Sequence, residues 1–287
     1  MKRKEFLKIG GGIALSGFVS NSILATIANF EDAKKNINFG LQLYTLRDDF
    51  PKDPKGILIL VAGFGYKQLE SFEGAKGMFW GMKNTEFKSY VNELGMNIVS
   101  SHCDIHKNFE TKVADAAAIE MKYLISPWVG AQKKIDDYKK IAEIFNQKGE
   151  ICKKNGIRFA YHNHNYSFEK LEGQFPQDVM MMNTDPDLVD FEMDIYWVVT
   201  AKENPEEWLK KYKNRFRLCH IKDRIKNAIE RDASCDLGTG SIDFAKILKT
   251  AKQNGMDYFI VEQEKYEGTT PLKSTQAGAT FLKNLKL

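Results

Sequence analysis

Phe159-Ala-Tyr-His-Asn-His-Asn165 is a short apolar run that ends in two histidines. In a β-strand, residues two apart point to the same face, so His162 and His164 are expected to aim at one spot where the strand stops. On this segment alone, the pair could equally be surface histidines at a strand-to-loop junction. A repeat of the same arrangement elsewhere in the chain would favour a shared site.

Strand-like and helix-like runs alternate on both sides of this stretch. Strands are predicted at 38–44, 66–72, 96–102, 123–128, 157–162, 189–194, 216–220 and 258–262. Helices are predicted at 54–63, 84–94, 110–121, 135–155, 205–213 and 241–254. Such alternation implies a parallel sheet with right-handed crossovers. Eight units predict an α/β fold that closes into a (β/α)₈ TIM barrel, which needs roughly 250 residues.

The first 28 residues have the pattern of an export signal. A basic start, Arg3-Lys-Glu-Phe-Leu-Lys8, precedes the apolar run 9–19 and small residues up to Ala28. The start resembles a twin-arginine signal with Lys4 in place of the second arginine, so the Tat and Sec routes both stay open. We expect a bacterial protein exported to the periplasm, with one barrel domain at 37–287. The alternatives are an amphipathic N-terminal helix and a retained anchor.

Composition and charge argue against several partners. Apolar residues make up 43% of the 287 positions, as in an ordinary soluble core. The net charge is +4, and the first 28 residues hold four basic and one acidic side chains, so the barrel is nearly neutral. We therefore expect no nucleic-acid partner and no stable membrane insertion, and a homo-oligomer stays open. The four cysteines form no C-x-x-C pair, which favours free buried thiols over a disulfide.

Polar side chains gather at the carboxyl ends of the predicted strands, where such barrels place their chemistry. All five histidines lie at or just beyond a strand end. In the strand 189–194, Glu192 and Asp194 share one face, and Phe191 and Met193 share the other. The acidic and imidazole face is therefore expected to point into the mouth of the barrel.

Carboxylates and neutral imidazoles that converge in one cavity need a compensating charge, and a divalent cation is the natural one. Four such side chains lie at the ends of consecutive strands: His162, Asp194, His220 and Glu262. Their separations of 32, 26 and 42 residues equal about one β/α unit per step. A mixed nitrogen and oxygen set suits one Mn²⁺, Co²⁺, Fe²⁺ or Zn²⁺ ion or, less well, Mg²⁺. The alternative is a salt-bridged polar network without a metal.

Seven motifs follow one another along the chain. They are Leu41-Gln-Leu-Tyr-Thr-Leu-Arg47, Ser101-His102, Tyr161-His-Asn-His164, Phe191-Glu-Met-Asp-Ile-Tyr-Trp197, His220-Ile-Lys-Asp223, Leu237-Gly-Thr-Gly-Ser-Ile-Asp243 and Val261-Glu-Gln263. In this order they resemble the xylose-isomerase-like TIM-barrel superfamily. The nearest group is the sugar phosphate isomerase/epimerases, whose relatives include inosose dehydratase and ketose 3-epimerases. The resemblance implies one metal at the ends of strands five to eight, on the same four residues.

Two positions depart from the pattern of that family. His162 stands where the epimerases carry a metal-bound glutamate, and Trp197 replaces a histidine often found after the strand-six aspartate. Those epimerases use two metal-bound glutamates as opposed proton-transfer bases, so the first departure weighs against a symmetrical two-base epimerisation. Dehydratase-like relatives tolerate a His-x-His strand five better, which favours elimination or hydration next to a ketone.

The resemblance implies proton abstraction next to a carbonyl that the metal polarises. Glu262 or His164 would remove the α proton, and Lys222 would help to stabilise the enediolate. Substrate contacts are expected from Gln42, Tyr44, Arg47, Glu70, His102, Trp128 and Trp197. As alternatives, the two tryptophans could simply cap the barrel, and Lys222 could only pair with Asp223.

Our first expectation is a metal-dependent isomerase or epimerase that acts on a keto- or aldo-sugar. The second is a lyase or hydratase that acts on 3-keto-sugars or keto-glycosides. Export favours an unphosphorylated small carbohydrate, and Gly238-Thr-Gly240 alone is a weak phosphate signal. A non-catalytic sugar- or metal-binding barrel is third, although the presence of Asp194 and Glu262 weighs against it. A DNA-repair endonuclease of the same superfamily would need more histidines and a basic groove.

Overall fold

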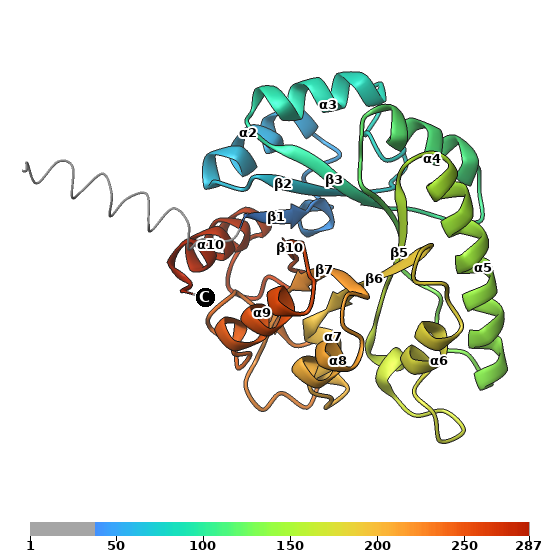
Figure 1. Cartoon of the computed structure of the whole chain (residues 1–287). Helices are drawn as coiled ribbons and strands as arrows, with labels where there is room; N and C mark the ends of the chain where they lie inside the picture. The colour runs from blue at the N-terminus through green and yellow to red at the C-terminus, as the bar shows by residue number, and fades with distance from the viewer. Residues whose placement is uncertain (1–37, 287) are drawn as a thin grey trace, which may run out of the picture. The chain divides into compact units, whose positions relative to one another are not determined.

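The computed structural model describes residues 38–286, which form a closed barrel (Figure 1). Its eight parallel strands follow the order β1-β10-β7-β6-β5-β4-β3-β2 around the ring. Helices surround the strands in Figure 1. The predicted (β/α)₈ barrel is therefore confirmed. The export signal predicted at 1–28 lies outside the described residues.

The barrel strands are short, and each ends close to its predicted position. They are β1 Phe39–Gln42, β2 Gln68–Phe72, β3 Asn97–His102, β4 Tyr123–Ser126, β5 Arg158–His162, β6 Val189–Asp194, β7 Phe216–Ile221 and β10 Tyr258–Val261. Two further short strands, β8 Asp223–Arg224 and β9 Ser234–Cys235, pair with each other outside the barrel. The first strand ends earlier than predicted because the chain turns into a 3₁₀ helix, η1 Leu43–Leu46.

The helices occupy the segments between the strands. They are α2 Pro54–Phe64, α3 Asn84–Glu93, α4 Phe109–Ala118, α5 Ile135–Lys154, α6 Pro176–Met182, α7 Ile195–Thr200, α8 Pro205–Lys211, α9 Phe244–Gln253 and α10 Pro271–Asn284, with a 3₁₀ turn, η2 Asn165–Phe168. None of these helices within residues 38–286 is long and apolar enough to cross a membrane. The sequence did not predict α6, α7 or α10.

Helix α2 illustrates how local sequence sets these boundaries. The Asp53 side chain caps its first turn by accepting from the Gly56 backbone N–H, which helices leave unpaired at their start. Ile57, Leu58 and Val61 lie on one stripe and are buried against the barrel. The helix ends at Gly65, whose φ of 99° lies in the left-handed region that glycine tolerates.

The alternation of side chains along the strands separates the apolar layer from the polar interior. Phe191 and Met193 of β6 belong to the apolar core under the helices. Glu192, between them, reaches across the barrel to His102 of β3. The register then aligns neighbouring polar residues, because His162 pairs with Glu192 and Asp194 pairs with His220 across adjacent strands. The predicted inward face of β6 is therefore present.

The four cysteines carry free thiols, as the sequence favoured. Cys103, Cys152 and Cys219 are buried, and Cys235 is partly buried. Cys219 lies on strand β7 and Cys152 on helix α5, where each packs as a small apolar side chain.

The carboxylate of Asp223 organises the loop that contains Gly238-Thr-Gly240. It accepts hydrogen bonds from the backbone N–H groups of Gly238 at 3.0 Å, Gly240 at 3.0 Å and Ile242 at 3.2 Å. These donors are therefore already satisfied by a side chain of the same protein. The segment does not present a free set of N–H groups to a phosphate.

Gly240→Ala is expected to destabilise the protein by about 1–3 kcal/mol. A Cβ at this position would overlap the Asp223 carboxylate and the Arg224 carbonyl, so the loop would have to shift. Thermal unfolding measures the effect as a drop of roughly 2–4 °C per kcal/mol. Gly63→Ala is the matched control, because a Cβ there meets no atom within 4 Å, and its melting temperature should stay level or rise. Equal drops in both variants would contradict the role given to Gly240.

Candidate active site

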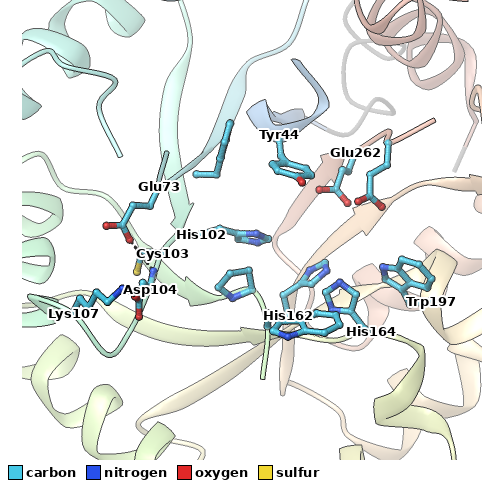
Figure 2. Close-up of a pocket in the computed structure, with 14 residues that line it drawn as sticks. Tyr44, Glu73, His102, Cys103, Asp104, Lys107, His162, His164, Trp197 and Glu262 are labelled. Carbon is cyan, nitrogen blue, oxygen red and sulfur yellow. Dashed lines mark hydrogen bonds and ion pairs between the residues drawn. The ribbon is translucent and has the colours of Figure 1, made fainter. Parts of the chain in front are cut away.

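A cavity of about 490 Å³ opens at the carboxyl ends of the strands (Figure 2). Its lining combines aromatic, imidazole and carboxylate side chains: Tyr44, Phe72, Glu73, His102, Cys103, Asp104, Lys107, Pro127, Trp128, His162, His164, Trp197, Glu262 and Glu264. In Figure 2 the histidines lie between Glu262 and the group formed by Glu73, Asp104 and Lys107. This is the end of the barrel at which the sequence places the chemistry.

The structure divides the predicted site residues between the cavity and the interior beneath it. Those that line the cavity are Tyr44, His102, Trp128, His162, His164, Trp197 and Glu262. Those that are fully buried in the barrel are Gln42, Glu70, Asp194, His220 and Lys222. Arg47 is partly buried outside the lining. The cavity is thus bounded by one set of predicted residues and supported by another.

Gln42 and Glu70, for which substrate contacts were predicted, are fully buried and are not among the residues that line the cavity. Gln42 donates to Glu70 at 2.7 Å, and the Ser100 hydroxyl donates to the same carboxylate at 2.6 Å. His220 Nε2 lies 2.7 Å from Glu70 Oε1. Both side chains face the interior one layer below the mouth, so their polar atoms are used within the barrel.

Arg47 holds the cavity wall instead of pointing into it. Its guanidinium donates to the backbone carbonyl of Glu264 at 2.9 Å and lies 4.7 Å from the centre of the Tyr44 ring. The arginine therefore connects the segment after β1 to the segment after β10. Its predicted contact with a substrate is replaced by a contact that positions Tyr44 and Glu264.

Three histidines surround one carboxylate in the barrel interior. Glu192 Oε2 lies 2.8 Å from His102 Nε2, 3.2 Å from His162 Nδ1 and 3.4 Å from His220 Nε2. We call His102, His162, Glu192 and His220 the inner cluster. The sequence placed Glu192 on the inward face but gave it no role. Its spacing of two residues from Asp194 was the signal that could have identified it.

A second group lies on the other side of the His220 ring. Glu262 Oε2 is 3.2 Å and Asp194 Oδ2 is 3.9 Å from His220 Nδ1. We call Asp194, His220 and Glu262 the outer set. His162, which the sequence grouped with them, comes no nearer than 3.8 Å to Asp194 Oδ2 and belongs to the inner cluster.

Lys222 lies among three carboxylates of this region. Its Nζ is 2.9 Å from Asp194 Oδ2, 2.9 Å from Glu262 Oε2 and 2.6 Å from Glu264 Oε2. The Trp197 ring covers the ammonium group at 5.0 Å. Lys222 is fully buried and does not pair with Asp223, which instead holds the loop after β9. All three of these ion pairs are to carboxylates of strand β6 or of the segment after β10.

The buried charges of the site fit a divalent cation. The interior holds four buried carboxylates and one buried lysine: Glu70, Glu192, Asp194, Glu262 and Lys222. The side chain of Glu264, which also contacts Lys222, is 33% exposed. With all four buried carboxylates ionised, one negative charge would remain even if His102 and His220 were both protonated. Burial raises the pKa values of Glu192 and Asp194, although Lys222 opposes the shift at Asp194. Glu192 Oε1 also has no hydrogen-bond partner, and Asp194 Oδ2 lies near Lys222 without hydrogen-bond geometry.

Glu262 and His164 are the two cavity residues that can exchange a proton with a ligand. Burial alone would raise the pKa of Glu262, but Lys222 and His220 hold it well below its usual value, so the group is ionised. Burial lowers the pKa of His164 to about 3, so its ring is neutral. His164 Nδ1 has no hydrogen-bond partner in the described structure. Trp128 and Trp197 lie 4.6 and 5.4 Å from the His164 ring.

A model of the xylose isomerase-like TIM barrel family matches residues 58–285, which is most of the barrel. The chain belongs to this family. A crystal structure of a sugar phosphate isomerase/epimerase from Parabacteroides distasonis is 30% identical, with a TM-score of 0.73, and the match covers 85% of this chain and 93% of that one. The family assignment therefore agrees with the resemblance that the strand-end motifs indicated.

Two other similar proteins differ more in sequence. Inosose dehydratase from Clostridium perfringens is 28% identical over 199 residues, which cover 63% of this chain and only 62% of the dehydratase. The IOLI protein, whose crystal structure contains a zinc atom, has a TM-score of 0.70 at 14% identity and covers 85% of this chain and 96% of its own. The second likeness concerns the fold alone.

Proposed function

We propose that this protein is a metal-dependent sugar isomerase or epimerase that removes the proton next to the carbonyl of a keto- or aldo-sugar. The observation that carries the proposal is the position of Glu262. It is an ionised carboxylate that lines the cavity, and it lies 3.2 Å from His220 at the edge of the histidine cluster. A base beside a cation site is an arrangement that can enolise a sugar.

The roles of the neighbouring residues follow from their contacts. Glu262 accepts the α proton, and Lys222 keeps it ionised between turnovers. The same ion pair makes Glu262 a weak base, so the α proton must be acidified. A divalent ion bound beside it would supply that acidity by polarising the carbonyl. The residues available to hold the ion are those of the inner cluster and the outer set.

The cavity suits a carbohydrate without a phosphate group. Among the described residues, Lys107 is the one lysine or arginine in its lining, and it lies 3.6 Å from Asp104 Oδ2. Glu73, Asp104, Glu262 and Glu264 line the same cavity, so its walls repel a phosphate dianion. Tyr44 and the two tryptophans supply aromatic faces against which the C–H face of a sugar ring can pack.

A lyase or hydratase is the second candidate, and one feature of strand β5 favours it. Strand β5 ends in His162, so no second carboxylate faces Glu262 from that position to act as the opposed base of an epimerase. His164 instead lines the cavity with a neutral ring, which could hydrogen-bond a departing or incoming hydroxyl group. The 28% identity to an inosose dehydratase also supports this candidate.

Proton NMR in D₂O with free ketoses and 3-keto-glucosides separates the two candidates. An isomer or epimer that carries deuterium next to the carbonyl, with every hydroxyl retained, supports the isomerase. An unsaturated product, or hydration of one, supports the lyase. Unchanged spectra with all substrates, in the presence of added divalent ions, would contradict both.

The cellular location of the protein is a separate proposal that rests on its sequence alone. We propose that the chain is exported and works in the periplasm, because residues 1–28 have the pattern of an export signal. Fractionation of expressing cells tests it. Full-length protein confined to the cytoplasm would contradict it.

A further inference from the structure

We propose that the inner cluster is the cation site of this protein and that Lys222 takes the place of a cation in the outer set. The inference depends on the proposed function only in that both involve a divalent ion. It differs from the site expected from the sequence, which joined His162, Asp194, His220 and Glu262.

The spacing of the inner cluster matches the edges of a metal coordination shell. Zinc–nitrogen and zinc–oxygen bonds of about 2.0–2.2 Å place tetrahedral ligand atoms roughly 3.3–3.5 Å apart. The distances from Glu192 Oε2 to His102 Nε2, His162 Nδ1 and His220 Nε2 are 2.8, 3.2 and 3.4 Å. All four ligand atoms lie within 4.8 Å of one another. His102 Nε2 and His220 Nε2 also lie 3.1 and 2.7 Å from Glu70 Oε1, so an ion would replace these two contacts as well as move the four groups slightly apart.

Glu192 has a buried carboxylate oxygen without a hydrogen-bond partner in the described part of the chain, and a bound ion would compensate its charge. The side chain is fully buried, and its Oε1 atom has no hydrogen-bond partner. Within residues 38–286, its ion pairs are to His102, His162 and His220, and none is to a lysine or arginine. A buried carboxylate without a fixed positive partner is costly, whereas three imidazoles and one carboxylate form a common ligand set.

The outer set already holds a fixed positive charge. Lys222 Nζ lies 2.9 Å from both Asp194 Oδ2 and Glu262 Oε2. A divalent ion bonded to either oxygen at about 2.2 Å would lie within roughly 5 Å of the ammonium group, where the two charges repel in a buried site. The lysine therefore competes with an ion for the outer set, whereas its ion pairs are to Asp194, Glu262 and Glu264 and include no residue of the inner cluster.

The register of strands β5 and β6 places the Glu192 carboxylate beside His162 in the inner cluster. Strand β5 ends in His162 rather than a carboxylate, and its direct partner across the β5–β6 ladder is Glu192. The neighbouring strand thus supplies the carboxylate at the same level of the barrel. His102 and His162 also line the cavity, so an ion held here would face a ligand. Glu262 would then remain free to act as a base.

Anomalous diffraction from crystals of the wild-type protein loaded with Zn²⁺ tests the inference without any substitution. The two ring nitrogens of His220 separate the two alternatives, because Nε2 faces Glu70 and Glu192, at 2.7 and 3.4 Å, and Nδ1 faces Glu262 at 3.2 Å. We expect one peak bonded to His220 Nε2 and Glu192. A peak bonded to His220 Nδ1, Asp194 and Glu262 would overturn the inference and leave the proposed function standing. Absence of any bound ion would overturn the inference, and the NMR experiment would then decide the function separately.

Metal titration of two isosteric variants gives a second readout in solution. Glu192→Gln should weaken Zn²⁺ binding by at least about 100-fold, because it removes a ligand. Glu262→Gln should weaken binding less, by about 10-fold, because Glu262 would only orient the His220 ring through Nδ1 at 3.2 Å. The reverse order would overturn the inference. Thermal unfolding of both variants verifies that each is folded, and only folded protein is titrated.

Discussion

Glu262→Gln is expected to lower the rate of α-proton exchange about 10³-fold, with the fold intact. The amide is nearly the same size as the carboxylate, but it cannot accept a proton at neutral pH. Lys222 keeps two carboxylate partners, Asp194 and Glu264, so the buried ammonium group stays paired. The initial rate of deuterium incorporation in D₂O, followed by proton NMR, measures the loss.

Glu73→Gln is the matched control for this substitution. Glu73 lines the same cavity, but its carboxylate accepts from the Lys112 ammonium at 2.6 Å and from the Asp104 backbone N–H at 2.8 Å. These bonds occupy the carboxylate, and within residues 38–286 it forms no hydrogen bond or ion pair with the histidine side chains. The rate should fall less than about 10-fold, well below the effect expected of a catalytic base. Similar losses in both variants would show that Glu262 has no special role.

Lys222→Met is expected to destabilise the protein by about 3–5 kcal/mol. The substitution leaves the buried carboxylates of Asp194 and Glu262 without the ammonium group, whose Nζ lies 2.9 Å from an oxygen of each. For a chain of this size, the melting temperature should fall by roughly 2–4 °C per kcal/mol. Urea unfolding, monitored by circular dichroism, measures the free energy directly.

Lys246→Met provides the comparison on the surface. The Lys246 ammonium lies 2.7 Å from Glu206 Oε2, but the lysine side chain is 68% exposed, against 0% for Lys222. Solvent screens the surface pair, so the loss should stay below about 1 kcal/mol. Equal losses in the two variants would mean that the carboxylates around Lys222 are uncharged in the folded protein.

The barrel and the inward face of its strands could be predicted because both depend on local patterns. Strand and helix periods alternate along the chain, and the two-residue spacing placed Glu192 and Asp194 on one face. Helix α7 was missed because Ile195-Tyr-Trp-Val-Val199 is rich in residues that favour strands. Its start depends on Asp194, whose side chain accepts from the Trp197 backbone N–H.

The detailed partners in the site could not be predicted because they depend on packing across the barrel. Glu70 meets His220 at 2.7 Å although 150 residues separate them. A strand-end position fixes the face of a side chain but not its depth, so Glu70 was assigned to the cavity instead of the interior. His220 belongs to both the inner cluster and the outer set, and its ring orientation decides which nitrogen meets Glu192 and which meets Glu262. The sequence does not determine that orientation.

The central claim is that a divalent ion in this barrel makes a sugar α proton removable by Glu262. The most direct measurement is α-proton exchange in D₂O by chelator-treated protein, before and after one equivalent of Mn²⁺ or Zn²⁺ is restored. We predict that chelation lowers exchange at least about 100-fold and that the added ion restores it, because Lewis-acid polarisation supplies several kcal/mol. Exchange that continues unchanged in protein shown to be free of metal would contradict the account.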